Sequence, residues 1–294
     1  MGKRGQISYF ILVAVALLIV FVGVLYWVTS QQKIEVVTQG SPITAMPAIQ
    51  NFMQACVELV ATKGVYHIAY QGGYVNPKGS LKYGEPGDRR RNHYYTRDTV
   101  LPYAVNGGQV LLRSLGGMEM ALSHYVLVNL DQCLDFSNFE EQGLQVQKPL
   151  LNFKETGFDN VRVPYAAETI SAMSTIVEDR VTLDVTYPVL VKSNRGQALI
   201  TRAVAVLPFR LGRLHSITGA LVTEASQYNP YDLYQHCKKY GARDGMINLY
   251  LDENIQYQDH MLSVVDARPL EAGFTPLRFQ VGILNNNMTG ACTG

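Results

Sequence analysis

One uncharged apolar run near the N-terminus limits what this chain can fold into more than any other feature. Residues 7–28 contain no Asp, Glu, Lys, Arg or His. At about 1.5 Å per residue, a helix of this length reaches roughly 30 Å and can cross the hydrocarbon core of a membrane. A secretory signal peptide has a shorter apolar core and a small-x-small cleavage site, and neither occurs here. We therefore expect a retained transmembrane helix in contact with membrane lipid; a buried core helix is the alternative.

The charges beside this run predict its orientation. Lys3 and Arg4 precede it, whereas Lys33 on the far side is balanced by Glu35. The positive-inside rule then keeps residues 1–6 in the cytoplasm as a leader and puts the rest of the chain on the extracellular side of a single-pass cell-membrane protein. Removing Lys3 and Arg4 from the 25 basic residues leaves 23 against 24 acidic ones, a net charge of −1. This balance gives no electrostatic reason to expect a nucleic-acid partner.

The outer part divides by its patterns into a stalk at 29–45, a helical lobe at 46–145 and an antiparallel α+β lobe at 146–294. Two amphipathic helices are expected in the first lobe, one beginning at Met46 and one near Ser114. The first helix carries its apolar face on Ile49, Phe52, Met53, Cys56, Leu59 and Val60. Between the helices, residues 74–101 are rich in Gly, Pro, Tyr and charge and predict a long surface loop.

The second lobe changes to alternating Thr, Val, Ile and Leu, which indicates strands. Segments 169–178, 180–192 and 197–206 are expected to form an antiparallel meander, with residues 211–226 as a helix packed on it. Further strands are expected at 246–252, 258–266 and 277–284. The predicted fold class is therefore α+β: an N-terminal transmembrane helix, two amphipathic helices, and a mainly antiparallel sheet with a packed helix.

Four cysteines, Cys56, Cys133, Cys237 and Cys292, are far apart and form no Cys-x-x-Cys motif, so their spacing argues against a zinc knuckle. Outside the cytoplasm disulfides are plausible. Four cysteines allow three pairings, and we favour Cys56 with Cys133 because each lies on the apolar face of a predicted helix. Ordinary buried thiols are the alternative.

No familiar catalytic motif occurs, so no catalytic residue and no cofactor are predicted. The six histidines are scattered, which gives no reason to predict a metal site. Arg89, Arg90 and Arg91, followed by Tyr94 and Tyr95, form a basic and aromatic stretch. Such a stretch could bind nucleic acid, but Glu85, Asp88 and Asp98 flank it. We favour a solvated loop, or a binding loop that contacts an acidic partner such as lipid headgroups or surface glycans. Asn287 begins an Asn-x-Thr sequon and is a glycosylation candidate.

The N-terminus resembles a known class of signals. Lys3-Arg4-Gly5-Gln6 before an apolar helix is similar to the class III signal of archaeal type IV pilin-like proteins. This resemblance implies processing between Gly5 and Gln6 and assembly into a filament, although Phe10 stands where many such pilins carry glutamate. The same start, with the cysteine-bearing helix and the exit 70–74, also resembles single-pass surface proteins of DPANN archaea, which implies no activity.

Three hypotheses for the function follow. The first is a non-enzymatic surface protein with a structural or adhesive role, which associates with itself or with other surface proteins either as a fixed anchor or as a processed filament subunit. The alternative is an anchored module that binds a ligand or partner through loop 74–101. An extracytoplasmic hydrolase is the least favoured, and would require an acid, a base and a nucleophile to converge in one cleft.

Overall fold

The computed structural model describes residues 36–40, 45–75, 93–95, 100–106, 108–149, 153–155, 162–164, 170–227, 231–232, 246–254, 259–268, 275–284 and 288–289. The predicted leader and transmembrane helix lie outside these residues. The helices of the described part are α2 (Met46–Tyr70), α4 (Leu115–Cys133), α5 (Ser137–Glu140) and α6 (Leu211–Gln227). The α+β fold class is confirmed.

The first sheet contains the predicted meander. It consists of β1 (Val36–Gly40), β5 (Gln145–Gln147), β8 (Ser171–Ile176), β9 (Val181–Ser193) and β10 (Gly196–Leu207). All pairings in it are antiparallel: β10 lies between β1 and β9, and both β5 and β8 pair with β9. The side chains of β9 alternate between buried and half-buried, as expected for a strand with one face on the core. Its first strand, β1, comes from the segment predicted as a stalk.

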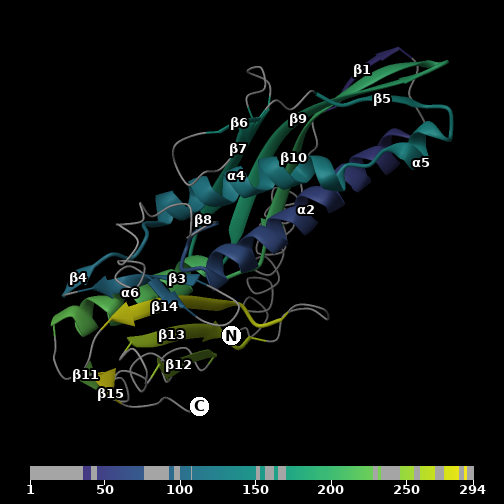
Figure 1. Ribbon diagram of the computed structural model, residues 1–294. Helices are drawn as coiled ribbons and strands as arrows, with labels where there is room; N and C mark the ends of the chain where they lie inside the picture. Colours follow the sequence, from purple (N-terminus) through teal and green to yellow (C-terminus); the bar gives the residue numbers. More distant parts are fainter. Residues whose placement is uncertain are drawn as a thin grey trace, which may run out of the picture.

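The helices α2 and α4 lie side by side across one face of this sheet, with α2 against β10 and α4 against β8 (Figure 1). Ser114 caps α4, since its side chain accepts a hydrogen bond from the backbone N–H of Gly117. At Gly64 the helices approach closely, because an added Cβ would come within 2.8 Å of the side chains of Leu122 and Tyr125. The buried face of α2 includes most of the predicted positions, but Leu59 is 49% exposed.

The second sheet contains six strands. These are β2 (His93–Tyr95), β3 (Val100–Asn106), β4 (Gln109–Val110), β12 (Ile247–Asn254), β13 (Asp259–Asp266) and β14 (Arg278–Leu284). Its order is β12-β13-β14-β3-β2, with β4 also paired to β3. The pairing of β14 with β3 is parallel, so this sheet is mixed. Two small sheets pair β6 (Phe153–Glu155) with β7 (Arg162–Pro164), and β11 (Tyr231–Asp232) with β15 (Met288–Thr289).

Two predictions about this half of the molecule are wrong in detail. The helix α6 packs on β3, β4, β13 and β14 of the second sheet, not on the meander (Figure 1). Periodicity shows that a helix has a buried face but does not identify the partner of that face. Loop 74–101 is not without structure, because β2 and the start of β3 lie within it. Pro102 interrupts the strand pattern of this segment, so β3 was not predicted. It is the third residue of β3 and pairs with His93 of β2.

Candidate functional site

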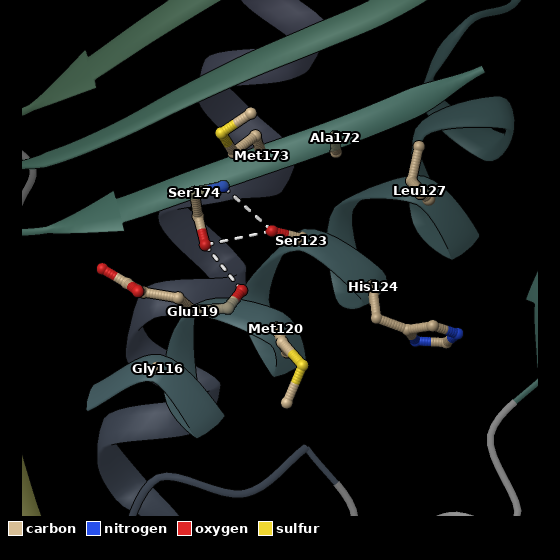
Figure 2. Close-up of a pocket in the computed structure, with 9 residues that line it drawn as sticks. All are labelled: Gly116, Glu119, Met120, Ser123, His124, Leu127, Ala172, Met173 and Ser174. Atoms are coloured by element: carbon tan, nitrogen blue, oxygen red, sulfur yellow. Dashed lines mark hydrogen bonds between the residues drawn. The ribbon is translucent and has the colours of Figure 1, made fainter. Parts of the chain in front are cut away.

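The outer edge of β8 is closed by side chains of α4. The backbone N–H of Ile176 donates to Glu119 Oε1 at 2.8 Å, and the backbone N–H of Ser174 donates to Ser123 Oγ at 2.9 Å. The Ser123 hydroxyl donates to Ser174 Oγ, which in turn donates to the carbonyl oxygen of Glu119 (Figure 2). Glu119 and Ser123 are four residues apart, so both lie on the helix face that meets the strand. The helix thus satisfies N–H groups that an edge strand would otherwise present to another chain.

Beside this contact, α4 and β8 border an open groove with a volume of about 400 Å³. Its lining residues are Gly116, Glu119, Met120, Ser123, His124, Leu127, Ala172, Met173 and Ser174. Met120 is 70% exposed and Met173 is 69% exposed. Met120 and His124 extend from successive turns of α4. Met173 extends from the face of β8 that points away from α4 (Figure 2).

The exposed side chains of the groove are of a kind that adapts to a partner surface. Thioether side chains are flexible and polarizable, and they adapt to partner surfaces of different shape. The hydroxyls of Ser123 and Ser174 are bonded to each other and to the backbone, which commits both groups to holding β8 against α4. Among the residues that the structure describes, no cluster of His, Cys, Asp and Glu is arranged to hold a metal ion. The exposed side chains of Met120 and Met173 make the groove a candidate contact surface.

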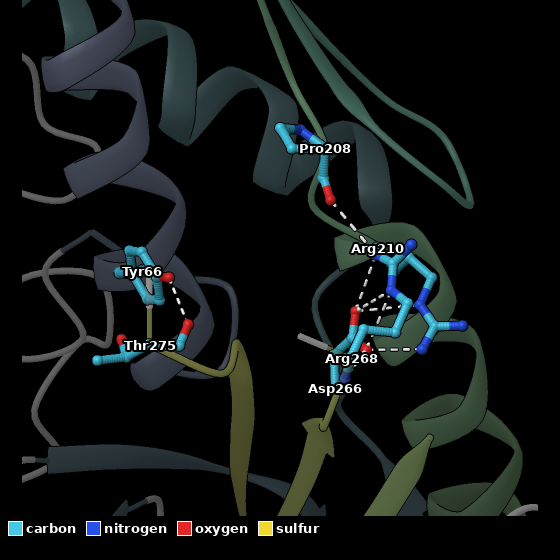
Figure 3. Close-up of polar contacts among 6 residues, drawn as sticks. All are labelled: Tyr66, Pro208, Arg210, Asp266, Arg268 and Thr275. Carbon is cyan, nitrogen blue, oxygen red and sulfur yellow. Dashed lines mark hydrogen bonds and ion pairs between the residues drawn. The ribbon is translucent and has the colours of Figure 1, made fainter. Parts of the chain in front are cut away.

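A second polar cluster joins α6 to the second sheet. Asp266, at the end of β13, is 1% exposed and accepts hydrogen bonds from Arg210 Nε at 3.0 Å and Nη2 at 2.6 Å. Arg268 donates to the same carboxylate through Nη2 at 3.0 Å and also reaches the carbonyl oxygen of Pro208 (Figure 3). Burial alone would raise the pKa of Asp266, but the hydrogen bonds from the two guanidinium groups hold it below its ordinary value. This arrangement fixes the segment between β10 and α6.

Tyr66 makes a further connection between the helical layer and the second sheet. The Tyr66 hydroxyl, on α2, donates to the carbonyl oxygen of Thr275 at 2.5 Å (Figure 3). Its ring packs edge-on against Phe209, which lies between β10 and α6. Burial raises the pKa of the Tyr66 hydroxyl above its ordinary value. The contact has a structural role, since the Tyr66 hydroxyl is bonded to Thr275 and its ring packs against Phe209.

The structure describes four of the predicted site residues, and the others lie outside the described part of the chain. Cys56 and Cys133 are at disulfide-bonding distance, with Cα atoms 5.7 Å apart. Tyr94 and Tyr95 belong to β2, where they pair with Leu101 and Val100. The other candidates lie outside the described residues: Gly5, Gln6, Arg89, Arg90, Arg91, Cys237, Asn287 and Cys292.

Sequence reasoning missed the groove and the edge contact. Glu119 and Ser123 are polar residues four apart in a mainly apolar helix, and this spacing was the available signal. It could indicate a polar contact but not the strand that receives it.

Within the described part of the chain, no helix combines the length and apolar character needed to span a bilayer. Comparison with family models, with curated proteins and with solved structures found no significant match to this chain.

Proposed function

We propose that this chain is a membrane-anchored extracytoplasmic protein with a non-enzymatic structural or adhesive role at the cell surface. The observation that carries the proposal is the proximity of Cys56 on α2 to Cys133 on α4. Disulfides persist in oxidising compartments and are rare in the cytosol. A cross-link between the two helices that cover the first sheet would therefore suit a domain outside the cytoplasm.

The N-terminal pattern supports the same location. The uncharged run at 7–28 has the length of a membrane helix, and Lys3 and Arg4 before it favour a cytoplasmic N-terminus. Such a helix can serve as a permanent anchor, or can pack in a filament core after processing at Gly5 and Gln6. Both forms need an outer domain that makes durable contacts, and the groove beside Met120 and Met173 offers one such surface.

Location can be tested on intact cells that express the full-length chain. A membrane-impermeant maleimide added to the cells should label Val206→Cys, at a position that is 43% exposed, more strongly than the parent chain. Protease added outside the cells should remove the region after residue 28. Protection of this region in intact cells, with cleavage only after lysis, would refute the proposal.

Mass spectrometry of the mature N-terminus separates the two forms. A polypeptide that begins at Gln6 supports a filament subunit, whereas an intact leader supports a fixed anchor. Gly5→Leu should block processing, if processing occurs, without changing the membrane location.

A second candidate is an anchored module that binds an acidic ligand or partner through loop 74–101. It is favoured by the pairing of β2 with β3, which ties the end of this loop to the second sheet. Binding residues are often carried on loops that a rigid scaffold positions. Replacement of Arg89, Arg90 and Arg91 by Ala should abolish binding to anionic vesicles or cells while circular dichroism remains unchanged. Unchanged binding would remove this candidate.

A further inference from the structure

The strand edges of the two sheets differ in whether other groups cover them. The outer edge of β8 is covered by Glu119 and Ser123 of α4. At the border of the second sheet, β12 pairs with β13 and has no second strand partner among the described residues. With eight residues, β12 is also the longest single-partner strand in this part of the chain. An edge of this length presents a row of backbone donors and acceptors to which another strand can pair.

The two faces of β12 differ in polarity. Ile247 and Leu249 are each 3% exposed and lie on the core face of the sheet. Asn248, Tyr250 and Asp252 alternate with them and lie on the other face. Tyr250 is 37% exposed, and the guanidinium of Arg278 lies 5.7 Å from the centre of its ring. The strand therefore offers an edge with an apolar side and a polar side.

This order of residues is complementary to itself. When two antiparallel copies of β12 are related by a twofold axis at Tyr250, Leu249 of one copy is opposite Leu251 of the other, on the core face. On the polar face, Asn248 is opposite Asp252 of the second copy, so an amide donor meets a carboxylate acceptor twice. Directly opposite side chains of this kind stabilise a strand pair. A register centred on Asp252 would instead place the two Asp252 carboxylates opposite each other, and like charges weaken a strand pair.

We propose that two copies of this protein associate through their β12 strands, antiparallel and centred on Tyr250, to join their second sheets into one. The inference deepens the proposed surface role, on which it rests, by naming the partner as a second copy and the contact as a strand edge. Main-chain hydrogen bonds supply the attraction in such β-augmentation, and the facing side chains set the register. A surface protein built in this way becomes a paired unit in the plane of the membrane.

Exchange of the two polar residues tests the register. The full-length protein is purified in detergent, and its dimer dissociation constant is measured by analytical ultracentrifugation. Asn248→Asp places carboxylates opposite each other at both symmetric positions and should weaken the dimer about fivefold or more. The N248D/D252N double variant restores an amide opposite a carboxylate and should recover the original dissociation constant. Circular dichroism melting of each variant shows whether the monomer remains folded.

Cysteine cross-linking tests the same contact in native membranes, in the full-length protein. Side chains directly opposite in an antiparallel pair have Cβ atoms about 4.5–5.5 Å apart. Tyr250→Cys should therefore yield a disulfide-linked dimer on mild oxidation. Val206→Cys, at a site that is 43% exposed but on β10 of the first sheet, is the matched control and should give no more dimer than the parent chain.

The outcomes separate this inference from the proposed function. A monomeric parent protein, an N248D variant that dimerises like the parent, or equal cross-linking of Y250C and V206C would overturn the β12 contact. None of these results would change the labelling and protease experiments on cell-surface location. Conversely, a cytosolic chain that still dimerises through β12 would retain the contact and remove the surface role.

Discussion

The carboxylate of Glu119 accepts a hydrogen bond from the backbone N–H of Ile176, 57 positions away in the sequence. The bond joins the first turns of α4 to the last residue of β8, and Ser123 makes the equivalent contact to Ser174 one turn later. A helix that lies along a strand usually covers it with apolar side chains. Here the polar side chains also replace the missing neighbour strand, so α4 both packs the core and closes an edge.

Loss of the Glu119 carboxylate should destabilise the protein. In Glu119→Ala the N–H of Ile176 has no acceptor from this side chain, and we expect the free energy of unfolding to fall by about 1–3 kcal/mol. Glu119→Gln retains an amide oxygen as acceptor and should lose less. Urea unfolding of the full-length protein in detergent, followed by far-ultraviolet circular dichroism, measures the difference.

Met120→Ala is the control for this experiment. Met120 neighbours Glu119 on α4 but is 70% exposed, so its truncation should change the free energy of unfolding by no more than about 0.5 kcal/mol. Equal stability of the Ala variants at 119 and 120 would show that the edge contact contributes nothing.

Two glycines near helix starts should respond in opposite ways to alanine. A Cβ at Gly212 in α6 would lie 2.5 Å from the carbonyl oxygen of Val177, a backbone atom that cannot rotate away. Gly212→Ala should therefore lower the free energy of unfolding by about 1–3 kcal/mol. A Cβ at Gly116 in α4 meets nothing within 4 Å, so Gly116→Ala should leave stability unchanged or raise it by up to about 1 kcal/mol. Thermal melts that shift equally for both variants would contradict this contrast.

The sequence predicted the elements of this fold better than their contacts. Alternation in β9 and β10 is a local property that follows from burial of one face, and both strands were found within a few residues of their predicted ends. The start of α4 was marked by Ser114, whose capping role depends on residues three positions away. The pairing of Cys56 with Cys133 was accessible because both residues lie on apolar helix faces.

The failures arose where distant segments decide the structure. The strand β3 contains Pro102 and acquires its place through pairing with β14, which follows it by more than 170 positions. The position of α6 depends on Arg210 and its contact with Asp266, and no periodicity in residues 211–226 reports that contact. The groove beside Met120 needs α4 and β8 together, and methionines at such spacing in a single sequence are indistinguishable from core residues.

Removal of the cross-link between α2 and α4 should weaken the domain. Cys56 and Cys133 are separated by 77 positions, so a bond between them restricts a long loop of the unfolded chain. We expect C56S/C133S to lower the free energy of unfolding by about 2–5 kcal/mol. Treatment with reductant should lower the melting temperature of the parent protein but not that of the double variant. An insensitive parent protein would show that the two thiols are not bonded.

Asp266 should make the stability of the protein depend on pH in the acid range. The two arginines hold the pKa of this carboxyl below its ordinary value in the folded state. The unfolded chain, with an Asp pKa of about 4, therefore takes up a proton first as the pH falls. The stabilisation is complete at neutral pH, starts to decline as the pH approaches 4 and is lost as the pH falls to the pKa of the folded state.

Substitution of Asp266 isolates this contribution. Asp266→Asn leaves Arg210, whose side chain is 12% exposed, without its buried counter-charge, and should lower the free energy of unfolding at pH 7 by about 3–5 kcal/mol. Asp184→Asn breaks a more exposed pair with Arg202, so it should change stability by no more than about 1 kcal/mol. Urea unfolding between pH 7 and pH 3 should give a shallower decline for D266N than for the parent protein or D184N. Parallel declines for all three proteins would mean that other carboxylates set the acid sensitivity. Arg268→Gln removes the more exposed partner of Asp266, so this variant should have intermediate stability and stay folded at neutral pH.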